Sequence, residues 1–190
     1  MNKDAVIVVS GLPRSGTSMM MKMLEAGGLQ VLTDNIRSAD EDNPKGYYEF
    51  EVVKELESNK DWLKDASGKV VKIISQLLKQ LPSEYHFKVV FMRRKMEEVL
   101  ASQKQMLVRR GEPTDTIGDD KMAKIFQTHL LQVESWLAKQ PNIEVLYVHY
   151  TEALESPLPV IDKINKFLDG KLDTKKMAAV VDKSLHRQRA

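Results

Sequence analysis

The sequence predicts an α/β three-layer sandwich, built on a mostly parallel central sheet of about five strands and folded as one domain over residues 1–190. Short runs of β-branched apolar residues alternate along the chain with amphipathic helical patterns. Several runs are apolar on both faces, which is typical of parallel strands covered by helices on both sides. With 190 residues, 42% of them hydrophobic and 29% charged, the chain can bury a core of its own.

The predicted strands follow from short apolar runs, and the helices from apolar stripes with a 3.6-residue period. The strands are expected at residues 5–9, 29–32, 69–75, 87–92 and 143–148. Helices are expected at residues 17–26, 96–107, 122–137 and 160–168. Gly27 and Gly28 end the first helix, and Ser156 followed by Pro157 opens the last. Because ligands of such folds bind at the carboxyl ends of the strands, we look for function in the residues that follow each strand.

Composition narrows the function classes. The net charge is +2, without long blocks of either sign, so we expect no nucleic-acid partner. The chain has no cysteine, which excludes disulfides and thiolate metal sites. No apolar stretch approaches the roughly 20 residues of a membrane span, and no signal peptide is recognisable. We therefore expect a cytoplasmic protein.

The first strand leads into a glycine loop at residues 11–18 (GLPRSGTS). Its GxxxxG spacing, followed by a helix, is typical of a phosphate-binding P-loop, in which backbone N–H groups and the helix dipole hold the anion. Nucleoside triphosphatases place a lysine after the second glycine, but Thr17 stands there, and the loop's cation is Arg14. Strands 87–92 and 143–148 are followed by arginine and histidine, so neither offers a carboxylate for Mg²⁺. The pattern predicts a phosphate-like anion held by side-chain cations, with no metal.

A second anion site is predicted at Arg94 and Ser102, eight residues apart at the end of a strand and on the next helix. PRSGTS at residues 13–18 together with RRKMEEVLAS at 93–102 resembles the sulfotransferases that use 3′-phosphoadenosine 5′-phosphosulfate (PAPS). The resemblance implies a P-loop fold and PAPS as sulfuryl donor. It also implies that the loop grips the 5′-phosphosulfate, while the second motif grips the 3′-phosphate. The implied donor-binding residues are Arg14, Ser15, Gly16, Thr17, Ser18, Arg94 and Ser102.

Weaker likenesses to short bacterial-type members lie at residues 43–49 (NPKGYYE) and 149–154 (HYTEAL). Two features depart from the family pattern. The Lys-x-His strand motif of the cytosolic aryl and steroid enzymes is here Lys72-Ile73-Ile74, which keeps the lysine and loses the histidine. Their carboxy-terminal Arg-Lys-Gly loop is absent, and Arg187 is the one candidate replacement.

Sulfuryl transfer needs cations near the leaving oxygen and a base for the acceptor. We expect Arg14 and Lys72 to supply the charge and Glu49 to act as base. His149, Asp34 and Asp42 remain alternatives for the base. The acceptor, a small or surface-presented hydroxyl or amine compound, is expected between loops 34–49 and 111–118. Two other interpretations remain open: a P-loop nucleotide-dependent phosphotransferase, and a non-catalytic nucleotide-binding module.

Overall fold

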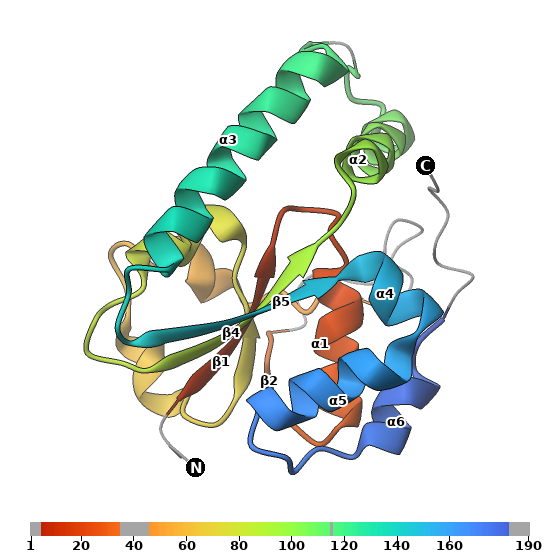
Figure 1. The fold of residues 1–190 in the computed structure, drawn as a ribbon. Coiled ribbons are helices and arrows are strands. Elements are labelled where there is room, and N and C mark those ends of the chain that lie inside the picture. Colours follow the sequence, from red (N-terminus) through yellow and green to blue (C-terminus); the bar gives the residue numbers. More distant parts are fainter. Residues whose placement is uncertain (1–4, 35–45, 115, 183–190) are drawn as a thin grey trace.

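The computed structural model describes residues 5–34, 46–114 and 116–182, and these fold around a five-stranded parallel sheet (Figure 1). The strands lie in the order β2-β3-β1-β4-β5, and every pair is parallel. Their bounds are β1 Val6–Gly11, β2 Val31–Leu32, β3 Val70–Lys72, β4 Phe87–Arg93 and β5 Ile143–His149. The predicted α/β class and parallel sheet are thereby confirmed.

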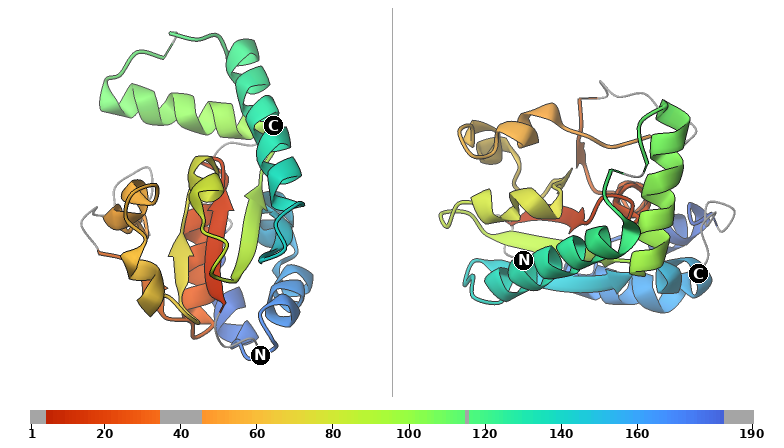
Figure 2. Two further views of the ribbon diagram at one scale, coloured as in Figure 1. Left: turned by 90° about the vertical axis from the view of Figure 1, so that its left-hand side faces the viewer. Right: turned by 90° about the horizontal axis from the view of Figure 1, so that it is seen from above.

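Helices cover the sheet on both faces (Figure 2). On one face, α1 (Thr17–Ala26), α4 (Tyr150–Glu155), α5 (Pro157–Phe167) and α6 (Thr174–Ala179) enclose a core with alternate residues of β1 such as Ile7 and Val9. The opposite face is covered by the 3-10 helices η1 (Glu51–Glu55), η2 (Asp61–Asp65) and η3 (Ser75–Gln80), together with the carboxyl end of α3 (Asp119–Leu137). Val6 and Val8 point into this second core. The alternation along β1 explains why its sequence is apolar throughout.

Two helices form an arm that extends beyond the sheet. α2 (Met96–Arg110) leaves the end of β4, and α3 returns to the molecule (Figures 1 and 2). Of the described residues of α3, only Val133 and Leu137 are buried. Most of the arm is therefore held by the ends of its two helices. None of the described helices is long and apolar enough to cross a membrane.

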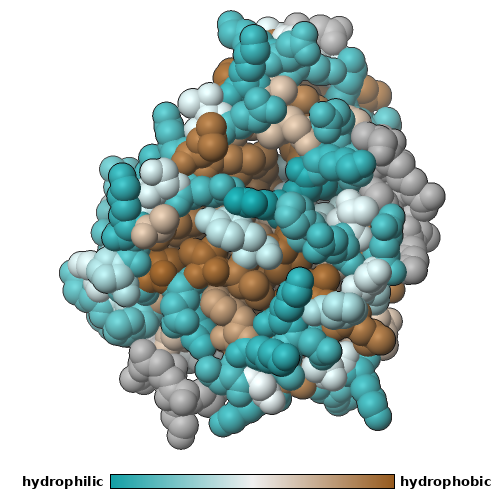
Figure 3. Space-filling model, viewed as in Figure 1, coloured by the Kyte–Doolittle hydropathy of each residue, from teal (hydrophilic) through white to brown (hydrophobic). Residues whose placement is uncertain are grey.

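The prediction for residues 143–148 as a strand buried on both faces was wrong in one respect. β5 is the edge strand of the sheet, and Glu144, Tyr147 and His149 are exposed or half-buried. Figure 3 shows apolar side chains at the surface in the middle of this face, where β5 crosses in Figure 1. An edge strand and a central strand can have equally apolar sequences, because each packs at least one face against the core. The sequence of residues 143–148 therefore does not show that this strand lies at the edge.

Candidate functional site

The glycine loop between β1 and α1 has a tight, strained backbone. Arg14 adopts a φ of 70°, a left-handed conformation that is uncommon for a residue with a side chain. Ser15 closes the turn, since its hydroxyl donates to the carbonyl of Leu12 at 2.7 Å and its backbone N–H donates to the same oxygen at 3.2 Å. Gly16, with a φ of 95°, is the residue before α1, and no side chain caps that helix. The first turn of a helix points backbone N–H groups out of its amino end, here towards the glycine loop.

Both loop glycines lie where a side chain cannot fit. A Cβ on Gly11 would lie 2.6 Å from the backbone oxygen of Met92 on β4. A Cβ on Gly16 would overlap the ring of Tyr150, the first residue of α4. The loop is therefore fixed by its neighbours β4 and α4 as well as by its own turn.

Arg94 is buried against the same loop. Its Nη1 donates to the backbone oxygen of Arg14 at 3.0 Å, and its Nε donates to Glu98 at 2.8 Å. The guanidinium carbon lies 4.4 Å from the centre of the Tyr150 ring. The Arg94 and Glu98 side chains are 7% and 2% exposed, so this pair holds the guanidinium in one place. Arg94 lies two residues before α2, and Glu98 lies in its first turn, four residues further on. This spacing brings the two side chains to the same side of the chain.

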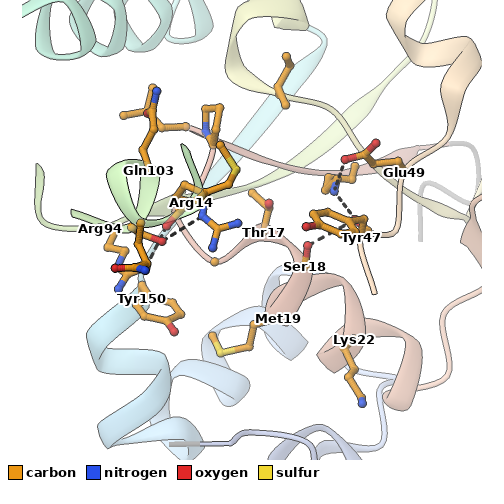
Figure 4. A pocket seen from close by; sticks show the side chains of 18 of the residues that line it. Arg14, Thr17, Ser18, Met19, Lys22, Tyr47, Glu49, Arg94, Gln103 and Tyr150 are labelled. Carbon is orange, nitrogen blue, oxygen red and sulfur yellow. Dashed lines mark hydrogen bonds and ion pairs between the residues drawn. The ribbon is translucent and has the colours of Figure 1, made fainter. Parts of the chain in front are cut away.

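The two motifs found in the sequence meet directly. Nε of Arg14 donates to the Ser102 hydroxyl at 3.0 Å, across 88 residues of chain. Both side chains line one cavity of about 680 Å³, together with Gly16, Thr17 and Ser18 (Figure 4). Arg94 lines it too. Of the predicted donor-binding residues, Ser15 is 1% exposed and lies behind the loop, while Arg187 lies outside the described residues.

Lys72 and Glu49 lie on the opposite side of the loop. Lys72 is the last residue of β3. Its Nζ donates to the backbone oxygen of Tyr47 and lies 3.9 Å from Oε1 of Glu49. Tyr47 also accepts a hydrogen bond from the Ser18 hydroxyl at 3.4 Å. Figure 4 shows Glu49 and Tyr47 across from Arg94, with Thr17 and Ser18 between them. Glu49 and Lys72 both line the cavity.

The other candidate bases are placed elsewhere. His149 is exposed at the end of β5 and is not among the described residues that line the cavity. Asp34 is turned towards η1, where its Oδ2 accepts from the backbone N–H of Glu51 at 2.5 Å. Asp42 lies outside the described residues, as does most of loop 34–49.

Two residues that matter at this site were missed by the sequence analysis. Tyr150 packs on Gly16 and under Arg94, and burial raises the pKa of its phenol, which keeps it a neutral hydroxyl. Glu98 orients Arg94. The signal for Glu98 was present in its four-residue spacing from Arg94. The signal for Tyr150 was only its place directly after a strand.

Comparisons with known proteins agree with this geometry. The profile of the sulfotransferase domain family matches residues 4–188. No match is found among curated proteins. Among solved structures, a sulfotransferase of Mycobacterium tuberculosis, STF1, superimposes with a TM-score of 0.62 and 18% identity, over 94% of this chain and 70% of that one.

Mouse sulfotransferase SULT7A1, complexed with PAP, superimposes with a TM-score of 0.58 and 16% identity, over 95% of this chain. The chain spans 62% of the length of that mouse protein. A sulfotransferase domain from the curacin biosynthetic pathway gives a TM-score of 0.55 and 12% identity, over 98% of this chain and 92% of that one. With identities this low, these structures compare the fold alone. The profile match over nearly the whole sequence decides the family: the chain belongs to the sulfotransferase domain family.

Proposed function

We propose that the protein transfers the sulfuryl group of PAPS to a hydroxyl or amine acceptor. The observation that carries this proposal is the contact of Arg14 with Ser102, which brings the glycine loop and the second anion motif to one cavity. PAPS carries anionic groups at both the 5′ and the 3′ position of its ribose, so it needs two anion sites close together in one cavity. The family match and the complex of the mouse protein with PAP support the same donor.

The residues present fit such a donor. The amino end of α1, uncapped by any side chain, supplies backbone N–H groups and a positive helix dipole for a 5′-phosphosulfate. Arg94 and Ser102 supply donors for a 3′-phosphate, and the buried Glu98 fixes the angle of Arg94. The cavity volume of about 680 Å³ falls within the range of ligand sites, about 300–1,000 Å³.

PAPS supplies a sulfuryl group on a phosphosulfate anhydride, which passes to the acceptor while adenosine 3′,5′-bisphosphate leaves. In our proposal Arg14 and Lys72 stabilise the negative charge on the leaving oxygen from the two sides of the loop. Both cations are held by backbone or side-chain oxygens, so little reorganisation is needed. Side-chain cations are proposed for this role because β4 and β5 end in Arg93 and His149 and carry no carboxylate there.

Glu49 is proposed as the base that takes the acceptor proton. The position where the cytosolic aryl and steroid enzymes carry their histidine is here Ile74, which lines the cavity and is 41% exposed. An aliphatic side chain cannot accept a proton. Glu49 lines the same cavity, and the Lys72 ammonium lies 3.9 Å from its carboxylate. We propose that residues 1–190 act as one domain in the cytoplasm.

Thermal denaturation tests the donor. Adenosine 3′,5′-bisphosphate at about 100 times its dissociation constant adds about 2.7 kcal/mol to the free energy of unfolding, which raises Tm by several degrees. We expect this rise with the bisphosphate and a smaller one with ATP and Mg²⁺. Stabilisation by ATP and Mg²⁺ alone would contradict the proposal and favour a phosphotransferase. Stabilisation by the bisphosphate without transfer of labelled sulfate to any acceptor class would favour a non-catalytic binding module.

A further inference from the structure

The cavity continues past the glycine loop into a second half, away from Arg94. This acceptor half lies between η1 and η3 on one side and α2 and α3 on the other. In the left view of Figure 2, α2 extends over the 3-10 helices, and its carboxyl end lies above η1. Glu49 lies where the two halves meet (Figure 4), and Lys72 lies beside it, with its Nζ 3.9 Å from Oε1 of Glu49. An acceptor that reaches Glu49 must therefore occupy this half.

The walls of the acceptor half are apolar. The side chains that form them come from four elements or their flanks: Phe50, Val53, Ile74, Leu77, Met106 and Phe126. Ile74, at 41% exposed, is one of the few large hydrophobic side chains that remain accessible in the described chain. Apolar groups that face an open cavity favour an apolar ligand, because its binding removes their surface from water.

One face of α2 runs along this half, and the side chain that it presents to the cavity is polar in one turn, apolar in the next and basic in the last. Ser102, Met106 and the pair Arg109 and Arg110 follow at spacings of four and then three to four residues, so they lie on one side of the helix. Ser102 belongs to the donor half and Met106 to the apolar wall. With a rise of about 1.5 Å per residue, the arginines lie about 11 Å along the helix from Ser102.

Basic side chains line the outer end of the acceptor half. Lys54 lines it from η1 and forms an ion pair with Glu51 at 2.7 Å. Glu49 lines the inner end of this half, and Lys72 lies beside it. Arg109 and Arg110, in the last turn of α2, line the cavity from the opposite wall. Both are exposed to solvent and reachable by a ligand.

We propose that the acceptor is an amphipathic small molecule, with a hydroxyl at one end, an apolar body, and an anionic group such as a carboxylate at the other. The hydroxyl lies at Glu49, the apolar body lies against Ile74, Leu77 and Phe126, and the anionic group pairs with Arg109 and Arg110. This inference rests on the proposed function, because it assigns the hydroxyl to the same base. It adds the class of acceptor and the residues that select it.

The test uses 4-hydroxyphenyl alkanoic acids of increasing chain length and their methyl esters. Transfer of labelled sulfate gives kcat/KM for each compound, and calorimetry gives its affinity for the protein saturated with adenosine 3′,5′-bisphosphate. We expect each added methylene to raise affinity by about three- to fourfold until the chain spans the cavity. The acids should be preferred to the esters by about fivefold to tenfold, the range for one or two partly exposed ion pairs.

The variant Arg109→Gln/Arg110→Gln should reduce the preference for acid over ester to about one. Lys104→Gln is the matched control, since Lys104 is an exposed cation of the same helix that does not line the cavity. It should leave the preference at its wild-type value. A circular dichroism spectrum equal to the wild type shows that the double variant is folded.

Equal use of acids and esters, or an unchanged preference in the double variant, would overturn the inference while the proposed function stands. Stronger transfer to an acidic oligosaccharide than to any phenol would also overturn it. A failure of the proposed function is seen separately, because the bisphosphate would then not bind. Direct calorimetry of the longest acid against the free protein still tests the arginines in that case, and no binding would overturn the inference.

Discussion

The two halves of the cavity are built differently. In the donor half, buried polar side chains are hydrogen-bonded to neighbouring groups: Ser15, 1% exposed, to the Leu12 carbonyl, Glu98, 2% exposed, to Arg94, and Ser102, 8% exposed, to Arg14. In the acceptor half, apolar side chains and arginines face open space. The donor half is therefore fixed before any ligand arrives, whereas the acceptor half presents side chains that a ligand would cover.

The difference follows from the sheet. The donor half is formed at the ends of β1 and β4, two adjacent strands in the interior of the sheet, where backbone positions are set by neighbours on both sides. The acceptor half is formed by short 3-10 helices and by an arm whose α3 has buried residues only near its carboxyl end. A change in the acceptor half can thus alter substrate preference without disturbing the nucleotide site.

The largest effect is expected at the boundary between the halves. Glu49→Gln should lower kcat by about 10²–10⁴-fold, because the base is lost, and leave the affinity for adenosine 3′,5′-bisphosphate unchanged. Initial rates with labelled PAPS and calorimetry measure the two quantities. Glu51→Gln, a nearby exposed carboxylate, is the control. If the Glu49 variant turned over at the wild-type rate, the base would lie elsewhere. Weaker bisphosphate binding would place Glu49 in the donor half.

Gly16→Ala tests how rigid the donor half is. The new methyl group would overlap the Tyr150 ring, and the φ of 95° at this position is unfavourable for alanine. We therefore expect a loss of about 2–4 kcal/mol in the free energy of unfolding. Urea denaturation measures it. Gly118→Ala, at the residue before α3, where φ is −60° and a Cβ meets nothing within 4 Å, should change stability by less than about 1 kcal/mol. Similar values for the two variants would show that the loop yields easily.

A smaller effect is expected for Ser102→Ala, which removes one hydrogen bond from the donor half. The dissociation constant of adenosine 3′,5′-bisphosphate should rise about threefold to tenfold, equivalent to about 0.5–1.5 kcal/mol. Calorimetry measures it, with the exposed Ser58→Ala as control. We prefer this variant to Arg94→Ala, which would leave the buried Glu98 carboxylate without its partner. An unchanged constant would remove Ser102 from the nucleotide site.

The smallest effect is expected on the pH dependence of stability, through the contact that joins α3 of the arm to η3. Nε2 of His129 on α3 lies 2.9 Å from the Ser75 hydroxyl at the start of η3. Burial, and secondarily Lys79, lowers the pKa of His129. The unfolded chain therefore binds more protons as the pH falls below about 6.5, and stability should decrease there.

His129→Gln should flatten this dependence, while stability above pH 7 changes little. Urea denaturation between pH 5 and 8 measures the slope for both proteins. Equal slopes in the wild type and the variant would contradict the assignment to His129.

Much of the fold could be predicted because the burial of one face of each helix or strand produces the apolar periodicity seen in the sequence. The stripe at residues 17–26 ends at the same residues as α1, and Met20, Met21 and Met23 are buried behind the loop as packing. The 3-10 helices were not predicted, since no period of 3.6 marks them. The edge position of β5 was also hidden, because strand order depends on crossovers that a single apolar run does not encode.

The candidate site was predictable where local sequence carries the function. Gly16 and the spacing of Arg94 from Ser102 marked residues that the fold brings to one cavity. Tyr150 was not predictable as a support for the loop, because it meets Gly16 only through the packing of α4. In the sequence, Arg109 and Arg110 have only the pattern of basic residues that commonly end a helix. Their place on the cavity depends on where α2 points.

A crystal structure with adenosine 3′,5′-bisphosphate tests the central claim most directly. We predict the 5′-phosphate on the backbone N–H groups of residues 16–18 and the 3′-phosphate within hydrogen-bond distance of both Arg94 and Ser102. Binding in which either phosphate lies away from its predicted partners, or in which the nucleotide occupies the acceptor half beside Arg109, would contradict it.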